Sequence, residues 1–246
     1  MIAALGMYPF AHLRDAYDAL WVAVRAQLAD GPDSLDIDID IHDSWLRDDL
    51  LLGQTCGWPL VARLTGTVEV VGAFDVAVPF AREGTYRSVL VASKPLGVAE
   101  WRADPSTVCA VNGMESLSGW ISLQWAWGGV PPRLLETGAH VESVRAVAEG
   151  RAHLAAIDGV SWEFITESQP ALAGRVNIVG HGPVIGTLPL VTSKANAHRV
   201  GELRAGLAAA VEDPLLAPAL ARLRIRGFVP CGLEAYSALP ALLPAG

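Results

Sequence analysis

The chain has 246 residues and a mass of 26.0 kDa, with 52% hydrophobic and 18% charged residues. This composition excludes a disordered chain, and the net charge of -8 argues against a nucleic-acid binder that relies on a basic surface. The mean hydropathy is +0.34, but the apolar runs are far shorter than the ~20 residues that a membrane-spanning helix needs, so we expect no membrane span.

The apolar residues recur every two residues in some segments, as in strands, and about every 3.6 residues in others, as in helices. This alternation is typical of an α/β fold. The N-terminal part predicts a strand at Ile2–Gly6, a helix at His12–Ala29 and a half-exposed strand at Asp36–Ile41. A buried strand at Leu50–Thr55 and a helix at Trp58–Leu64 follow.

Further strands and helices alternate through the rest of the chain. The expected strands are rich in Val, Ile, Leu and Ala: Val68–Ala73, Arg87–Ala92, Thr107–Val111, Leu134–Thr137, His153–Ile157, Val176–Val179 and Thr187–Val191. The expected helices have apolar residues at helical spacing: Trp120–Trp127, Val141–Glu149, Val160–Glu167, Val200–Val211 and Leu215–Arg224. No linker rich in Pro, Gly or Ser divides the chain, so two lobes would have to be joined by strands.

The sequence gives no indication of disulfides, a metal site or a secretory signal. Cys56, Cys109 and Cys231 are widely spaced, which does not fit a disulfide framework, and we expect small buried side chains. The histidines and cysteines show no metal-ligand spacing, so no metal or cofactor is expected. The N-terminus has no basic segment typical of a secretory signal, which predicts a cytoplasmic protein as the sequence stands, or a periplasmic one if a leader was removed.

Polar residues follow several of the predicted strands, at the position where open α/β sheets bind ligands. The Asn112–Gly119 loop is the clearest case, because Ser116 and Ser118 precede a helix whose dipole favours an anion. The simpler alternative is that one of these serines only caps the helix. The loop is neither a Walker loop nor a dinucleotide-binding motif.

His140 and Asp158 follow two further strands and allow two interpretations. They are either an acid/base pair or structural capping residues. A hydrolase triad has no sequence support, because the chain has no GxSxG motif to present the nucleophile. We therefore name no catalytic residue.

The chain resembles a known family, the phosphate-, phosphite- and phosphonate-binding proteins of ABC transporters. The matching segments occur in order over nearly the whole chain: Leu52-Gly53-Gln54-Thr55-Cys56-Gly57-Trp58-Pro59, Tyr86-Arg87-Ser88-Val89-Leu90-Val91, Val111-Asn112-Gly113, Ser116-Leu117-Ser118-Gly119, Thr137-Gly138-Ala139-His140, Ala155-Ala156-Ile157-Asp158 and Leu188-Pro189-Leu190-Val191-Thr192. The loop departs from the family's usual Ser-Thr-Ser-Gly, because Leu117 replaces one hydroxyl donor.

The resemblance implies a type II periplasmic-binding-protein fold, in which an α/β chain forms two lobes that close on a ligand in the cleft between them. Lobe one would comprise residues 1–86 and 187–246, and lobe two residues 87–186, with two strands crossing between them. The resemblance implies these ligand-binding residues: Tyr8, Thr55, Ser116, Ser118, Gly119, His140 and Asp158. The residues expected to wall the pocket lie beside the same loops: Met7, Trp58, Tyr86, Trp120 and Trp162.

The expected function is therefore a solute-binding protein for a small oxyanion, similar to phosphonate or phosphate, or for an organic anion. An ABC permease is a possible partner. The alternative is an enzyme on the same fold, such as a thiamin-precursor synthase or a chorismate-type dehydratase, since fold alone does not define function. A reactive Cys56 or His140 would favour the enzyme.

Overall fold

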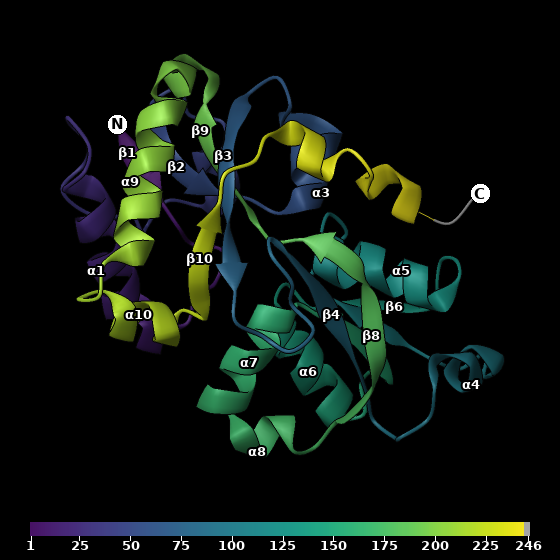
Figure 1. Ribbon diagram of the computed structural model, residues 1–246. Helices are drawn as coiled ribbons and strands as arrows, with labels where there is room; N and C mark the ends of the chain where they lie inside the picture. The colour runs from purple at the N-terminus through teal and green to yellow at the C-terminus, as the bar shows by residue number, and fades with distance from the viewer. Residues whose placement is uncertain (244–246) are drawn as a thin grey trace. The chain divides into compact units, whose positions relative to one another are not determined.

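The structure is a computed structural model that describes residues 1–243 and divides them into two compact units. Unit 1 consists of Met1–Ala77, Ala81–Thr85 and Gly186–Ser237. Unit 2 consists of Val78–Phe80, Tyr86–Ile185 and the described residues from Ala238 onward. Each unit is built on its own sheet (Figure 1), and each sheet has five strands. The strands and the helices around them confirm the α/β fold.

Unit 1 contains a mixed sheet with the strand order β1-β2-β9-β3-β10. Its strands are β1 (Ile2–Ala4), β2 (Leu50–Gln54), β3 (Val68–Val76), β9 (Pro189–Ser193) and β10 (Ile225–Val229). Only β1 and β2 pair in parallel; β2 with β9, β9 with β3 and β3 with β10 are antiparallel. The side chains of β2 and β9 are buried throughout, because both strands lie inside the sheet.

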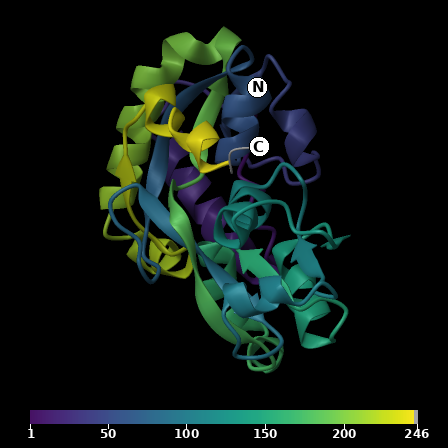
Figure 2. The same ribbon diagram turned by 90° about the vertical axis from the view of Figure 1, so that its right-hand side faces the viewer.

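Helices cover the sheet of unit 1. The α-helices are α1 (Arg14–Arg25), α2 (Ile41–Ser44), α3 (Gly57–Pro59), α9 (Val200–Glu212) and α10 (Ala217–Arg222). The shorter or irregular turns are η1 (Ala11–Leu13), the π-helical η2 (Leu60–Leu64), η4 (Lys194–Arg199) and η5 (Leu233–Tyr236). α1 packs on α9 and α10, and α9 packs on β3 and β10. Figure 2 shows α9, in light green, still beside these strands after the turn of the view.

Unit 2 contains a sheet with the strand order β6-β5-β7-β4-β8. Its strands are β4 (Thr85–Ala92), β5 (Cys109–Val111), β6 (Leu134–Glu136), β7 (Leu154–Ile157) and β8 (Asn177–Gly186). β5 runs parallel to both β6 and β7, whereas β4 is antiparallel to β7. The carboxyl ends of β5, β6 and β7 therefore lie at one edge of the sheet, together with the beginning of β4.

The helical segments of unit 2 are α4 (Val98–Ala103), the π-helical η3 (Leu117–Ile121), α5 (Ser122–Trp127), α6 (His140–Ala148), α7 (Gly159–Ser168), α8 (Pro170–Ala173) and η6 (Leu239–Leu242). Of these, η3, α6 and α7 follow β5, β6 and β7 and therefore begin at that same edge. η3 continues directly into α5, which ends at Gly128 with a φ of 75°. In the part of the chain that the structure describes, no helix is both long and apolar enough to cross a bilayer.

The structure corrects the prediction of a strand at Asp36–Ile41. Residues 36–40 form an irregular segment, and Ile41 begins α2. Asp36 Oδ1 accepts hydrogen bonds from the N–H groups of Asp38 and Ile39, and Asp40 Oδ1 accepts from His42 and Asp43. Short acidic side chains thus satisfy the backbone locally, which competes with a sheet ladder.

Three further segments differ from the prediction. The helix expected at His12–Ala29 begins as a 3-10 turn and its α-helical part ends at Arg25. The helix α4 was not predicted. The strand expected at Thr187–Val191 forms instead at Pro189–Ser193, between β2 and β3 in the sheet of unit 1.

Candidate functional site

The polar loops of unit 2 meet at the carboxyl edge of its parallel strands. β5 leads to the loop with Ser116 and Ser118, β6 leads to His140, and β7 leads to Asp158. Each loop ends at the beginning of a helix, and the first N–H groups of a helix have no partner inside it. The edge therefore gathers three helix N-termini, whose dipoles all favour an anion.

Ser116 begins the first of these helices and caps it. Its Oγ accepts a hydrogen bond from Gly119 N at 2.9 Å, and its carbonyl accepts from the N–H groups of Trp120 and Ile121. Gly119 leaves no space for a side chain, because a Cβ would lie 1.9 Å from Asn112 Oδ1. The cap that the simpler interpretation predicted is therefore present at Ser116, and the hydroxyl of Ser118 is the one that it leaves for another role.

Ser118 and His140 form a hydrogen bond that fixes the direction of the serine hydroxyl. His140 Nδ1 lies 3.5 Å from the N–H of Asp158, which can only donate. Nδ1 is then the acceptor, and in the neutral ring Nε2 carries the proton. Nε2 lies 3.1 Å from Ser118 Oγ and donates to it, so the hydroxyl proton of Ser118 is available for a further acceptor.

The protonation of His140 follows from its surroundings. Burial lowers the pKa of His140, and the Asp158 carboxylate opposes this shift. The neutral ring is therefore favoured, in agreement with an Nδ1 that accepts a hydrogen bond.

Asp158 is buried and accepts hydrogen bonds with both of its carboxylate oxygens. Its side chain is 2% exposed, and its Oδ1 caps α7 by accepting from Ser161 N at 2.8 Å. Its Oδ2 accepts a hydrogen bond from the hydroxyl of Tyr86, which is buried at the beginning of β4. Both carboxylate oxygens thus have protein donors, so Asp158 fixes the positions of α7 and Tyr86.

A buried hydroxyl pair ties the Ser118 turn to the sheet. Ser88 lies two residues after Tyr86 in β4. Its Oγ donates to the carbonyl of Ser118 at 2.8 Å and lies 3.2 Å from Ser122 Oγ. Ser122 Oγ donates to the carbonyl of Leu117 at 3.0 Å. We did not predict Ser88 or Ser122, although the two-residue spacing from Tyr86 would place Ser88 on the same face of the strand.

The two tryptophans that were predicted to wall the pocket in unit 2 are buried near this edge of the sheet. Trp120 and Trp162 are buried at 9% and 7% exposure, in the first turns of their helices. Leu117, which replaces the family's second hydroxyl residue, is buried at 2% exposure and packs into the core of unit 2. The loop therefore offers one serine hydroxyl, at Ser118, that is not used as a cap.

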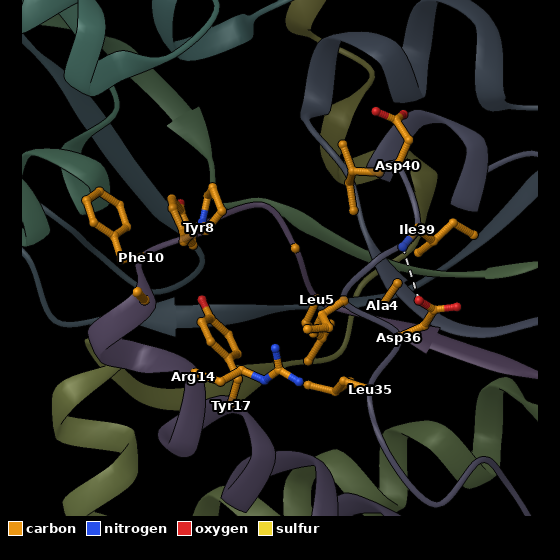
Figure 3. Close-up of a pocket in the computed structure, with 15 residues that line it drawn as sticks. Ala4, Leu5, Tyr8, Phe10, Arg14, Tyr17, Leu35, Asp36, Ile39 and Asp40 are labelled. Atoms are coloured by element: carbon orange, nitrogen blue, oxygen red, sulfur yellow. Dashed lines mark hydrogen bonds between the residues drawn. The ribbon is translucent and has the colours of Figure 1, made fainter.

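The predicted residues of unit 1 lie at the ends of β1 and β2. Met7 and Tyr8 follow β1 and are partly exposed, and Trp58 is partly exposed in α3. Thr55 follows β2, is fully buried, and its Oγ1 lies 3.4 Å from the carbonyl of Cys56. Tyr8 also lines a cavity of about 560 Å³ inside unit 1, drawn in Figure 3.

The cysteines are buried or partly buried. Cys56 and Cys109 are buried and Cys231 is half-buried. Burial raises the pKa of Cys109 to about 12, which makes it an inert thiol. Within residues 1–243, no group of three His, Cys, Asp or Glu side chains gathers as a metal site would require.

Comparison with known families decides what kind of protein this is. Residues 64–236 match the model of the ABC transporter, phosphonate, periplasmic substrate-binding protein family. The chain belongs to this family. The match confirms the resemblance seen in the sequence, and it confirms a solute-binding protein rather than an enzyme. A separate search of curated proteins found no match.

Solved structures share the fold. A binding protein component of an ABC phosphonate transporter from Pseudomonas aeruginosa is 16% identical, with a TM-score of 0.75 over 94% of this chain and 80% of that one. PhnD1 from Prochlorococcus marinus, in complex with methylphosphonate, is 14% identical, with a TM-score of 0.76 over 98% and 95%. A Xanthomonas citri protein bound to ATP is 15% identical, with a TM-score of 0.68 over 98% and 94%. At these identities the likeness concerns the fold.

Proposed function

We propose that this protein binds a small oxyanion with an organic substituent, of the phosphonate, phosphate or sulfonate type, at the carboxyl edge of the parallel strands of unit 2. The observation that carries the proposal is the hydrogen bond from His140 to Ser118, which leaves the serine proton for an anionic acceptor. The N-terminus of the helix at Ser118 adds backbone donors and a favourable dipole.

The other predicted residues take distinct parts in this proposal. Ser116 and Gly119 shape the helix start, and Asp158 holds Tyr86 and the beginning of α7. Tyr8 and Thr55 of unit 1 remain predicted ligand contacts. With Leu117 in the core, fewer hydroxyls face the oxyanion than the family pattern provides, so we expect the substituent to contribute to selectivity.

The proposal extends to the biological setting of the protein. A member of this family delivers its ligand to the permease of an ABC transporter, so we propose such a permease as the partner. The same membership supports a periplasmic location.

Isothermal titration calorimetry with methylphosphonate, phosphite, phosphate and methanesulfonate tests the proposal. At least one should bind, and Ser118→Ala should weaken it by about tenfold or more, because a hydrogen bond to a charged group is lost. Ser168→Ala is the matched control, since that hydroxyl only donates to Phe164 O at the opposite end of α7. Equal affinities of wild type and Ser118→Ala would show that the loop is no more than a helix cap.

A further inference from the structure

The strand β8 lies beside β4 at one end of the strand order in the sheet of unit 2 (Figure 1). With its ten residues it is the longest strand in the part of the chain that the structure describes. Its outer side pairs with no other strand among the described residues. Sheet edges are commonly protected by charged side chains, but residues 176–193 contain no Asp, Glu, Lys or Arg. β8 is therefore a long, uncharged edge that can pair with a further strand.

The pairing inside the sheet decides which backbone groups of β4 face β8. In an antiparallel pair, a residue that exchanges hydrogen bonds points both its N–H and its C=O at the same neighbour. Ser93 N, just after β4, donates to His153 O at 3.0 Å, and the ladder continues through the antiparallel pairs of β4 with β7. The odd-numbered residues of β4 therefore bond to β7, and its even-numbered residues face β8.

The outward-facing residues of β8 follow from the same alternation. A Cβ on Gly182 would lie 3.2 Å from Ser88 Cβ, so these two residues are neighbours across the strands. A Cβ on Gly180 would likewise lie 3.4 Å from Leu90 Cδ1. The even-numbered residues of β8 thus face β4, and the backbone groups of its odd-numbered residues point away from the sheet. Pro183 fits this assignment, since edge strands carry proline where the missing N–H would point outward.

The side chains along this edge are complementary to themselves. Ile178 and Val184 are 53% and 52% exposed, and they lie at equal distances in sequence before and after His181. When two copies of β8 pair antiparallel about His181, Ile178 of one copy lies opposite Val184 of the other. Such β-branched pairs stabilise a sheet. An edge without charges offers no ion pair to select a different protein, whereas this register matches the edge to a second copy.

Phe80 adds an exposed aromatic ring beside the centre of β8. Phe80 is 65% exposed and has a φ of 62°, a left-handed conformation that is unusual for a bulky residue. Its ring lies against that of His181, with the centroids 4.3 Å apart. Burial and then the nearby Arg87 lower the pKa of His181, which favours the neutral ring. Two neutral His181 rings, each beside a Phe80 ring, can therefore meet at a two-fold axis without like-charge repulsion.

We propose that this protein forms a homodimer in which the β8 edges of two copies pair antiparallel about His181. His181 exchanges both of its backbone hydrogen bonds with His181 of the second copy, and Asn177 does so with Ile185 of the second copy. Val179 lies opposite Pro183 of the second copy and keeps one bond, because proline has no N–H. The interface goes beyond the proposed oxyanion site, since it uses the outer edge of β8 and none of the residues expected to bind the ligand.

Sedimentation equilibrium of the full chain tests the dimer. We expect the mass to rise from the 26.0 kDa of one chain toward twice this value as the protein concentration increases. One pair of strands makes a small interface, so we expect a Kd of about 10–100 µM. A mass that stays at that of one chain up to about 1 mM protein would overturn the proposal.

A charge on the exposed face of β8 tests which surface forms the dimer. Val184→Lys should raise the Kd by about tenfold or more, because the ammonium group must lose water beside Ile178 of the second copy. Leu215→Lys is the matched control, since Leu215 is an apolar residue of unit 1 that is 89% exposed. This variant should dimerise as the wild type does. Equal Kd values for wild type and Val184→Lys, or equal weakening by both lysines, would show that β8 is not the interface.

Cysteine cross-linking tests the register. In the proposed pairing the two His181 Cα atoms lie about 5.5 Å apart, within the range that a disulfide spans. His181→Cys should therefore form an intermolecular disulfide on mild oxidation. Val179→Cys should not, because the two Val179 residues lie about 13 Å apart along the strands.

The wild type, oxidised in the same way, controls for the half-buried Cys231. A disulfide-linked dimer of His181→Cys alone supports the register about His181. No cross-linking of His181→Cys, or equal cross-linking of His181→Cys and Val179→Cys, would overturn the proposal.

Discussion

The strand ends of the two units show how one architecture carries different chemistry. In unit 2 the parallel strands β5, β6 and β7 lead to serines, a histidine and an aspartate that hydrogen-bond to one another. In unit 1 the parallel pair β1 and β2 leads to Tyr8 beside an apolar cavity and to a fully buried Thr55. The parallel edge collects the loops, and the composition of each loop decides whether the edge is polar or apolar.

The largest difference that we expect between the units is in the loss of stability when a glycine near the start of a helix is replaced by alanine. A Cβ on Gly159, the first residue of α7, would lie 2.5 Å from the backbone carbonyl of Arg87, which cannot move without the strand. We expect Gly159→Ala to lower the free energy of unfolding by about 3 kcal/mol.

The matched control is Gly201→Ala in α9 of unit 1, where no atom lies within 4 Å of the added Cβ. That variant should be unchanged or more stable by up to about 1 kcal/mol, because alanine favours helix over glycine. Urea unfolding of both variants provides the measurement. Equal effects at the two glycines would show that the close approach of α7 to β4 is wrong.

Two buried tyrosine hydroxyls sharpen the same comparison. Tyr86 donates to the Asp158 carboxylate in unit 2, and Tyr236 donates to the neutral carbonyl of Thr187 at 2.9 Å in unit 1. We expect Tyr86→Phe to cost about 2 kcal/mol and Tyr236→Phe about 1 kcal/mol, since hydrogen bonds to charged groups are stronger. Urea midpoints measure both costs, and the reverse order would contradict an anionic Asp158 partner.

The pH dependence of stability tests the neutral His140. Because burial lowers the pKa of His140 in the folded state, its contribution is fully present above the unfolded pKa of about 6.5 and is lost as the pH falls below it. The stability difference between wild type and His140→Gln should therefore shrink between pH 7.5 and 5.5.

His181, whose pKa is also lowered by burial and by Arg87, is present in both proteins and cancels in that difference. A stability difference that grows as the pH falls would mean that the folded protein favours the charged His140 ring. In that case His140 Nδ1 could not accept from Asp158.

The sequence was most informative where apolar periodicity and strand ends coincide. Leu50–Thr55 was expected as a buried strand because it is an apolar run that ends in polar residues, and His153–Ile157 was expected as a strand. The structure forms strands at Leu50–Gln54 and Leu154–Ile157. The order of the strands then brings Ser118, His140 and Asp158 together, which the loops alone could not specify. Membership in the family confirms the fold and the binding role that these segments indicated.

Periodicity failed where side chains bond to their own backbone. Asp36 and Asp40 alternate with isoleucines as a strand would, but their carboxylates turn the chain and leave an apolar wall. The helix at Val98–Ala103 was missed because it is short and begins at a glycine, with Glu100 bonding back to Gly97 N. Contacts such as Ser88 with Ser118 depend on strand pairing and have no local signal in the sequence.

The smallest expected effect on stability concerns Thr55, the buried hydroxyl of unit 1. Its Oγ1 lies 3.4 Å from the carbonyl of Cys56, near the limit of a hydrogen bond, whereas Thr192 Oγ1 lies 3.1 Å from Leu50 O. We expect Thr55→Val to change the free energy of unfolding by less than about 0.5 kcal/mol, and Thr192→Val to cost about 1 kcal/mol.

A hydroxyl with so weak a protein partner can also donate to a ligand, as the resemblance implies. Thr55→Val should therefore weaken methylphosphonate binding by about tenfold, while Thr192→Val leaves it unchanged. Calorimetry on both variants decides the point, because an unchanged affinity in Thr55→Val would assign this hydroxyl to the core of unit 1 alone.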